Sequence, residues 1–226
     1  MHSKSRNSVI ILTTIAVCCV VPMLGMVLRG SASVTAHETN LLQFLATWPE
    51  WLRGCSAILA YMFSTVGCIA LVAMLAVADH RITRDARIVG RDVIVSVAPI
   101  VYVTGVKWLV KRPRPITSEG SGLLPGDPSF PSGHTAAAVI VATMLLLTMR
   151  NLAHKRFSDG RTDSVRFIVC RTIISAVALV VVVACSRLLL GLHYPTDVVV
   201  SAVVCPLISY AVWCVWDLRD KERQRW

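Results

Sequence analysis

Charged residues are scarce in this chain of 226 residues, and acidic residues are the scarcest of them. Asp, Glu, Lys and Arg make up 16% of the sequence, with 13 acidic residues against 23 basic ones. Soluble globular domains carry about 25% charged residues, so a surface covered by water on all sides is disfavoured. The sequence also has no internal repeat and no low-complexity segment, which disfavours a solenoid or a fibrous protein.

The eight cysteines form no pattern that binds a metal or builds a disulfide framework. None of them forms a C-x-x-C pair, and all lie within or at the edges of apolar runs. Free cysteine in that setting behaves as a small hydrophobic residue. No cluster of Asp, Glu, Cys and His has the spacing of metal ligands either. We therefore expect no metal and no other cofactor.

Long apolar runs are what the chain has in abundance, since 55% of its residues are hydrophobic and its mean hydropathy is +0.64. About 20 helical residues cross the hydrocarbon core of a membrane. Five runs reach that length and a sixth, at 133–149, is shorter; the six cover about 8–28, 55–78, 92–110, 133–149, 167–187 and 196–216. Amphipathic helices that would bury such runs in a soluble protein are almost absent. The sequence predicts an all-α integral membrane bundle of six transmembrane helices, forming a single domain over 1–226.

Net charge +10 and a pI of about 9.6 are also typical of nucleic-acid-binding proteins, but here the basic residues follow the membrane topology. With both termini inside, the inner segments hold 16 of the 23 Lys and Arg residues and the outer segments hold seven. This bias matches the positive-inside rule. It predicts a multi-pass protein of the cytoplasmic membrane with both termini in the cytoplasm, and no nucleic-acid partner. Residues 37–52, with Trp48 and Trp51, are expected to lie at the outer interface.

The first motif, Lys107-x6-Arg114-Pro115, closes the third apolar run. Lys107, Lys111 and Arg114 follow i, i+4, i+7 spacing, which predicts that they share one helix face. Pro113 and Pro115 limit how far that helix can continue. Residues 111–131 are then the longest outer loop, rich in Pro and Gly. Taken alone, the motif is also typical of cations that reach from a membrane helix to the interface.

The second motif, Pro131-Ser132-Gly133-His134, immediately precedes an apolar run. A Ser-Gly pair at that position leaves backbone N–H groups free at a helix N-terminus, where they can bind a phosphate. Gly133 lets the backbone approach an oxyanion closely, and Ser132 can cap the helix or donate to a phosphate oxygen. An ordinary N-cap with an incidental histidine has the same pattern.

The third motif, Ser186-Arg187-x5-His193-x3-Asp197, lies at the entry to the last run, where Pro195 can begin a helix. One helical turn brings the Asp197 carboxylate to one ring nitrogen of His193, which fixes the tautomer and directs the other nitrogen outward as a nucleophile. Arg187 can clamp phosphate oxygens. Because the three motifs all meet one membrane face, we interpret them as one phosphate-handling site within 107–197 that acts on a phosphorylated lipid.

The three motifs together resemble the signature of the type 2 phosphatidic-acid phosphatase superfamily, whose site is shared with vanadium-dependent haloperoxidases and bacterial acid phosphatases. The resemblance implies a six-helix membrane fold and metal-independent hydrolysis of a phosphoester. It implies that His193 forms a phosphohistidine, that Asp197 orients it, and that His134 protonates the leaving oxygen. It also implies five phosphate-binding residues: Lys107, Arg114, Ser132, Gly133 and Arg187.

Lys111 and Arg112 are two further cations at the same outer helix end, and they suggest contacts to a second phosphate. A polyprenyl diphosphate, such as the undecaprenyl carrier lipid of cell-wall synthesis, is therefore one substrate hypothesis. Phosphatidic acid or phosphatidylglycerophosphate is the alternative, with Lys111 and Arg112 then contacting lipid headgroups. A lipid phosphotransferase and a transporter are the rival functions. A transport path would place ionisable residues near the midplane, whereas here they gather at one face.

Overall fold

The computed structural model describes the chain apart from residues 1, 116–125, 159–164 and 224–226. The described part holds eight α-helices and no strand. The helices are α1 (His2–Gly30), α2 (Ala32–Ala46), α3 (Glu50–Met62), α4 (Thr65–Thr83), α5 (Ala86–Val110), α6 (Gly133–Ser158), α7 (Val165–Leu189) and α8 (Pro195–Arg223). Of the predicted outer loop 111–131, residues 116–125 lie outside the described part.

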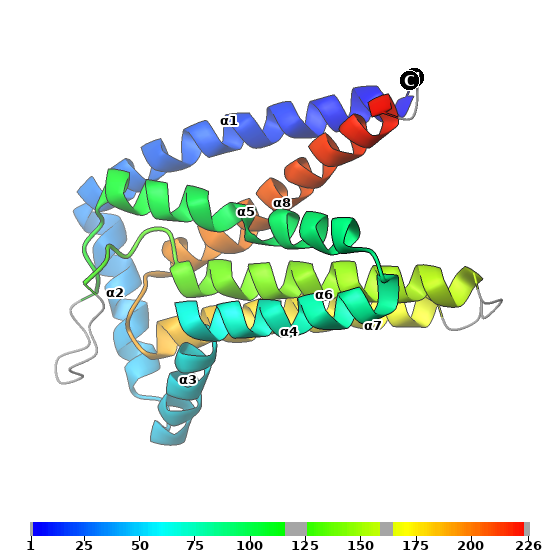
Figure 1. Cartoon of the computed structure of the whole chain (residues 1–226). Helices are drawn as coiled ribbons and strands as arrows, with labels where there is room; N and C mark the ends of the chain where they lie inside the picture. Colours follow the sequence, from blue (N-terminus) through cyan, green and yellow to red (C-terminus); the bar gives the residue numbers. More distant parts are fainter. Residues whose placement is uncertain (1, 116–125, 159–164, 224–226) are drawn as a thin grey trace.

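Six of these helices, α1 and α4 to α8, are long and apolar enough to cross a membrane. The predicted all-α bundle with six spans is therefore confirmed. Figure 1 shows the six running side by side, while α2 and α3 lie across one end of the bundle. The start of α1 and the end of α8 lie together at the opposite end of the bundle, where the Asn7 side chain donates to the Asp217 carboxylate at 3.1 Å.

The predicted second span at 55–78 is wrong as a single helix, because the chain breaks between α3 and α4. The Ser64 side chain caps α4 by accepting the N–H of Gly67 at 3.3 Å. A Cβ atom at position 67 would lie 2.1 Å from the Met62 carbonyl oxygen, so glycine is needed for this tight turn. The candidate membrane span is α4 alone, and α3 lies with α2 at one end of the bundle.

Helix α6 forms the centre of the bundle, with α4, α5, α7 and α8 packed around it. Every residue from Thr135 to Ala142 is buried, and four of these eight are alanines. Small side chains allow neighbouring helices to approach closely, which is how membrane bundles gain packing contacts. The N-terminus of α6 consequently lies in the middle of the bundle end, beside the ends of α5 and α7 and the start of α8.

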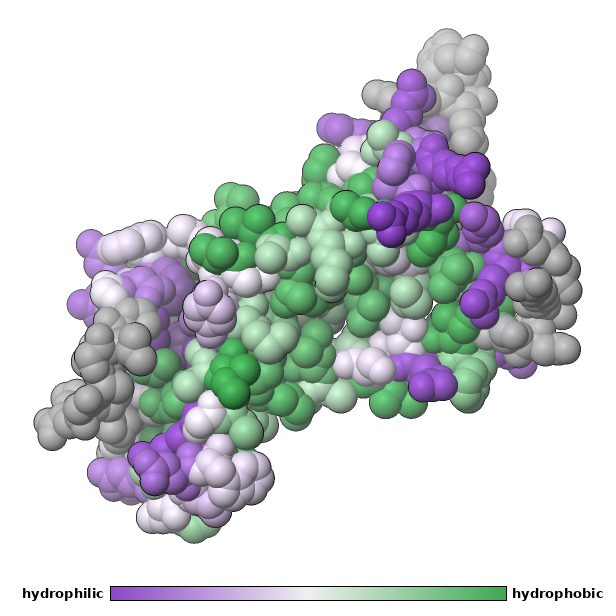
Figure 2. All heavy atoms as spheres, turned by 60° about the horizontal axis from the view of Figure 1, so that its bottom comes forward, coloured by the Kyte–Doolittle hydropathy of each residue, from purple (hydrophilic) through white to green (hydrophobic). Residues whose placement is uncertain are grey.

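Apolar side chains cover the outside of the spans. Figure 2 shows a hydrophobic belt across the middle of the face in view, with hydrophilic residues gathered at both ends. Large apolar side chains in this belt are exposed on several different helices, such as Ile69, Val101 and Ile174. Because an exposed apolar band of this extent is stable only against lipid, the belt marks the membrane-embedded part of the fold.

Candidate active site

The three motifs come together at the end of the bundle where α6 begins. Two backbone hydrogen bonds join the segments that carry them: Ser129 N–H donates to the Arg112 carbonyl at 2.9 Å, and Ser132 N–H donates to the Asp197 carbonyl at 3.1 Å. The helices then place the side chains, with Lys107 in the last turn of α5, His134 in the first turn of α6, Arg187 in the last turn of α7 and Asp197 in the first turn of α8. The predicted convergence on one face is therefore present in the fold.

The geometry around His193 assigns its tautomer. Its Nε2 atom lies 3.1 Å from Nη1 of Arg114, and a guanidinium N–H can only donate, so Nε2 must accept. The ring proton is then on Nδ1, which faces Oδ2 of Asp197 at 3.5 Å. That separation is long for a hydrogen bond, and Nδ1 has no closer acceptor among the described residues. Asp197 therefore orients the proton-bearing nitrogen, and Nε2 keeps the lone pair of a nucleophile.

His193 is buried, with 1% of its surface exposed. Burial lowers the pKa of its ring to about 4, although the nearby Asp197 carboxylate acts in the raising direction; the nearby Arg114 and Lys107 cations lower the pKa further. A histidine at such a position is neutral at physiological pH. Its lone pair is thus available without a separate base.

Lys107 and Arg114 share a carboxylate that the motif analysis did not identify. Asp127 lies 2.8 Å from Nζ of Lys107 through Oδ2 and 2.7 Å from Nη2 of Arg114 through Oδ1. Its side chain remains 41% exposed. Burial alone would raise the pKa of Asp127, but hydrogen bonds and charge from Lys107 and Arg114 outweigh it and lower the pKa to about 2. Asp127 therefore stays ionised and keeps the two cations side by side.

Arg187 is the most unusual cation of the site. It is 1% exposed, and its Nε and Nη2 atoms have no hydrogen-bond partner within the described part of the chain. Its charge lies close enough to interact with those of Arg114 and His134. Buried, unpaired N–H groups cost about 1–3 kcal/mol each, so Arg187 is poised to bind an anion.

The second motif begins α6 as predicted. The Ser132 side chain accepts hydrogen bonds from the N–H of Thr135 at 3.4 Å and from its hydroxyl at 3.1 Å, which caps the helix. A Cβ on Gly133 would meet only the Cε atom of Lys107, at 3.6 Å. His134 interacts electrostatically with His193, so the two predicted catalytic histidines are neighbours.

The predicted helix face of Lys107, Lys111 and Arg114 is wrong. Helix α5 ends at Val110, and Lys111 caps it in the left-handed conformation with a φ of 50°. Proline at 113 disfavours helical geometry for the residue before it, so the chain leaves the helix here. The turn directs Lys111 to the surface and turns Arg112 and Arg114 into the bundle end.

Arg112 is not free to contact a second phosphate. Its guanidinium is 1% exposed and pairs with Glu38 at 2.6 Å and with Asp197 at 2.8 Å. It also donates to the Thr196 hydroxyl at 2.8 Å and stacks on the Tyr194 ring at 4.1 Å. Of the two suggested diphosphate contacts, the structure leaves only the exposed Lys111.

Glu38 and Asp127 are the site residues that motif analysis missed. Each had a weak signal in the sequence. Glu38 is the only acidic residue before Glu50, and it lies in a segment otherwise suited to the membrane interface. Asp127 lies four residues before Pro131 and so close to the second motif. Neither signal indicates which residue is contacted. Glu38, for example, contacts Arg112 and Thr196, which lie 74 and 158 positions away in the sequence.

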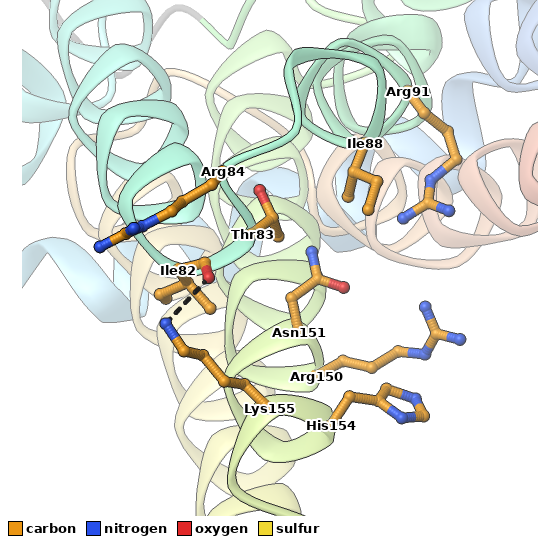
Figure 3. A pocket seen from close by; sticks show the side chains of 9 residues that line it. All are labelled: Ile82, Thr83, Arg84, Ile88, Arg91, Arg150, Asn151, His154 and Lys155. Carbon is orange, nitrogen blue, oxygen red and sulfur yellow. Dashed lines mark hydrogen bonds between the residues drawn. The ribbon is translucent and has the colours of Figure 1, made fainter. Parts of the chain in front are cut away.

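A separate hollow of about 730 Å³ lies at the opposite end of the bundle (Figure 3). Its walls come from the end of α4, the start of α5 and the end of α6, and they include Arg84, Arg91 and Arg150. Asn151 also lines the hollow, and its amide donates to the buried carboxylates Asp79 and Asp92 at 2.9 and 2.8 Å. None of the three motifs contributes to this hollow, so it is distinct from the candidate active site.

The phosphate-facing groups have a simple charge balance. The cations are Lys107 and Arg114, which lie near His193, and Arg187, which lies near Arg114; the carboxylate of Asp127 pairs with Lys107 and Arg114. These four side chains together therefore carry two positive charges in excess. A phosphate monoester dianion carries the matching charge, and fixed cations around its oxygens are what phosphoryl transfer requires.

Comparisons with known proteins agree with this geometry. A comparison with curated protein sequences finds no match to the chain. Among solved structures, the fold is similar to the crystal structure of a transmembrane PAP2-type phosphatidylglycerolphosphate phosphatase from Bacillus subtilis, with a TM-score of 0.69 and 16% sequence identity over 94% of this chain and 96% of that one. At that identity the likeness shows the fold alone. The sequence profile of the PAP2 superfamily matches residues 89–221, more than half of the chain and all three motifs, and the protein therefore belongs to the PAP2 superfamily.

Proposed function

We propose that the protein is a membrane lipid phosphatase that hydrolyses a phosphate monoester through a covalent intermediate on His193. The observation that carries this proposal is the buried Arg187 guanidinium, whose unpaired Nε and Nη2 lie in the same cation cluster as the nucleophilic Nε2 of His193. A buried cation of this kind is stable only if an anion completes the site. Membership of the PAP2 superfamily supports the reaction class.

The chemistry follows from the positions of the two histidines. Nε2 of His193 attacks phosphorus, the bond to the lipid oxygen breaks, and His134 gives that oxygen a proton. Water then attacks the phosphohistidine, His134 takes up a proton from it, and phosphate leaves with Nε2 free again. Lys107, Arg114, Arg187 and the amide at Gly133 hold the equatorial oxygens. Arg114 now lies on the Nε2 lone pair, so we expect it to move with the incoming phosphate.

The site is expected to face the outside of the cytoplasmic membrane. Support comes from the basic residues, since 16 of 23 fall in segments at the other end when both termini are inside. The basic hollow around Arg84, Arg91 and Arg150 lies at that inner end. The substrate is then a lipid of the outer leaflet whose phosphate reaches the end of the bundle.

A lipid monophosphate fits the site better than a diphosphate. The charge excess matches one phosphate dianion, and Arg112 is already paired with two carboxylates. The solved relative is a phosphatidylglycerolphosphate phosphatase, so that lipid and phosphatidic acid are the first monoesters to compare. Polyprenyl diphosphate remains the competing hypothesis, and the exposed Lys111 supports it. A Lys111→Ala variant with reduced kcat/KM for the diphosphate alone would favour that hypothesis.

The deciding experiment measures phosphate release by the purified protein from phosphatidylglycerolphosphate, phosphatidic acid and a polyprenyl diphosphate. We expect turnover in the presence of a chelator, because Lys and Arg supply the site's positive charge. Vanadate should inhibit as a mimic of the transition state. His193→Gln should abolish turnover. Activity of His193→Gln near that of the native protein would refute the proposal. Loss of native activity in the chelator, restored only by added magnesium, would also refute it. Transfer of phosphate to an added acceptor alcohol in preference to water would indicate a phosphotransferase.

A further inference from the structure

Three buried charges form a chain behind His193. Arg112 lies between two carboxylates, with Nη2 2.6 Å from Oε2 of Glu38 and Nη1 2.8 Å from Oδ1 of Asp197. All three side chains are almost fully buried. They come from α2, the segment after α5, and α8, so this one cluster connects three separate parts of the fold.

The Arg112 contact fixes how Asp197 faces His193. Oδ1 of Asp197 is bound to the guanidinium, while Oδ2 accepts the Tyr194 N–H at 2.9 Å and faces Nδ1 of His193. With one bond on each oxygen, the carboxylate cannot rotate without losing both. Its remaining lone pairs on Oδ2 therefore stay directed at the histidine.

Glu38 completes this arrangement from α2. Its Oε2 accepts from Arg112, and its Oε1 accepts the N–H of Thr196 at 2.8 Å. Thr196 is the second residue of α8, so Glu38 pairs one of the free N–H groups of the helix N-terminus. Glu38 thus holds both Arg112 and the helix that carries Asp197.

The charges of the cluster indicate why a second carboxylate is needed. Arg112 and Asp197 alone sum to zero, and such a pair has little net attraction for a positive histidine. Adding Glu38 gives the cluster one negative charge. In the proposed reaction His193 gains positive charge as Nε2 bonds to phosphorus, and a buried negative charge next to Nδ1 stabilises that state.

We propose that Arg112 and Glu38 are positioning residues of this active site, which act through Asp197 to orient His193 and to balance the charge it gains. This role rests on the proposed function of His193. It also accounts for Arg112 without any contact to substrate, because the described contacts to Glu38, Asp197, Thr196 and Tyr194 surround its guanidinium.

The test compares kcat and KM of the full-length protein with a short-chain phosphatidic acid for the native chain, Glu38→Gln, Arg112→Lys, Asp197→Asn and the Glu38→Gln/Asp197→Asn double variant. Glu38→Gln removes the charge but keeps the size. We expect kcat to fall about tenfold or more, as when the partners that orient a functional histidine are removed, with KM changed less than about twofold. Glu50→Gln, an exposed carboxylate at the same end, is the matched control and should behave as the native protein.

The double variant separates positioning from simple packing. If Glu38 acts through Asp197, Glu38→Gln should lower kcat less than about twofold once Asp197 is already Asn, because coupled residues are not additive. Equal loss in both backgrounds would overturn the role, as would a native kcat for Glu38→Gln. If Glu38→Gln does not fold, the Arg112→Lys variant tests the proposal instead. One ammonium cannot reach the oxygens of Glu38, Asp197 and Thr196 together, so kcat should fall at unchanged KM. A rise in KM alone, largest for a diphosphate, would assign Arg112 to substrate binding instead.

Asp197→Asn distinguishes failure of this inference from failure of the proposed function. If Asp197→Asn loses activity while Glu38→Gln and Arg112→Lys keep it, only the positioning role is wrong. If Asp197→Asn keeps the native kcat, the proposed chemistry of His193 is wrong, and the positioning role with it.

Discussion

Single residues in this protein are placed at an energetic cost that only ligand binding explains. Arg187 is buried beside Arg114 with two unpaired nitrogen atoms, and the structure offers it no carboxylate among its described neighbours. Asp197, in contrast, has a partner on each oxygen. The site therefore combines a fixed carboxylate, Asp197, beside His193 with a buried cation, Arg187, that has no counterion among the described residues.

Arg187→Met is expected to separate activity from stability. Methionine fills a similar volume without charge, and replacing an uncompensated buried cation by an apolar side chain raises the free energy of unfolding by about 1–3 kcal/mol. Turnover should fall ~100-fold or more, because a donor to the transition state is lost. Thermal unfolding and phosphate release in the same detergent would measure both effects. A clear drop in unfolding temperature would contradict this account of Arg187.

His193 should remain neutral to unusually low pH. Because burial lowers its pKa from 6.5 to about 4, the folded protein takes up this proton only near pH 4, whereas the unfolded chain binds it near 6.5. The free energy of unfolding that His193 contributes should therefore decrease as the pH falls from about 6.5 to about 4. Ring chemical shifts in histidine-labelled protein, assigned by the signal missing from His193→Gln, would measure the titration. A midpoint near 6.5 would contradict the burial effect.

At the scale of helices, α1 is fitted closely against the loop that carries the second motif. A Cβ on Gly25 would lie 2.6 Å from the Phe130 ring and 2.9 Å from a methyl group of Val110. Phe130 is fully buried and directly precedes Pro131. The position of α1 and the start of α6 are therefore linked through one aromatic ring.

Gly25→Ala is expected to lower stability and activity together. The extra methyl group forces Phe130 to shift, and overpacking of this kind costs about 1–3 kcal/mol. Gly30→Ala on the same helix is the control, because nothing lies within 4 Å of its added Cβ. Unfolding temperature and kcat of the two variants give the comparison. Equal behaviour of Gly25→Ala and Gly30→Ala would show that α1 does not constrain the motif loop.

Helices are also where sequence prediction succeeded and failed for identifiable reasons. Run length predicted the six spans, since a membrane requires about 20 apolar residues. It could not find the break at Ser64 and Gly67, because the sequence there stays apolar on both sides. The i, i+4, i+7 spacing of Lys107, Lys111 and Arg114 was misleading, since the helix ends at Val110.

The motif residues of the candidate site could be predicted from the sequence, whereas the carboxylates that contact them could not. His193 and Asp197 are only four residues apart, so they stay close in the fold, although His193 lies two residues before α8 begins and the expected helical turn does not include it. Glu38 reaches Arg112 from 74 residues away, and no local pattern encodes such a contact. Asp127 looked like a loop residue, and only the fold shows it between two motif cations.

The whole molecule has two polar ends of different character on either side of its apolar belt (Figure 2). One end holds the motifs, and the other holds the start of α1, the end of α8 and the hollow around Arg91 and Arg150. The positive-inside rule predicts that the second end lies in the cytoplasm. The orientation of the entire bundle then follows from the labelling of any two positions at opposite ends.

Two single cysteines can test this orientation in a variant without the eight native cysteines. Thr47→Cys lies between α2 and α3 at the motif end, and Ser158→Cys lies at the end of α6. A thiol reagent that cannot cross membranes should label position 47 in intact cells and position 158 only after lysis. The reverse pattern would place the active site in the cytoplasm.

The contact between α1 and α8 also has a consequence for biosynthesis. Translation proceeds from α1 toward α8, so the partner that Asn7 finds in Asp217 emerges about 210 residues later. The same holds for Glu38, which meets Arg112 and Thr196 only when later segments have entered the membrane. A nascent chain that has not yet produced α8 lacks Asp197 and the closed bundle end. If Asp197 has the proposed role, the nascent chain should therefore stay inactive until its last span is inserted.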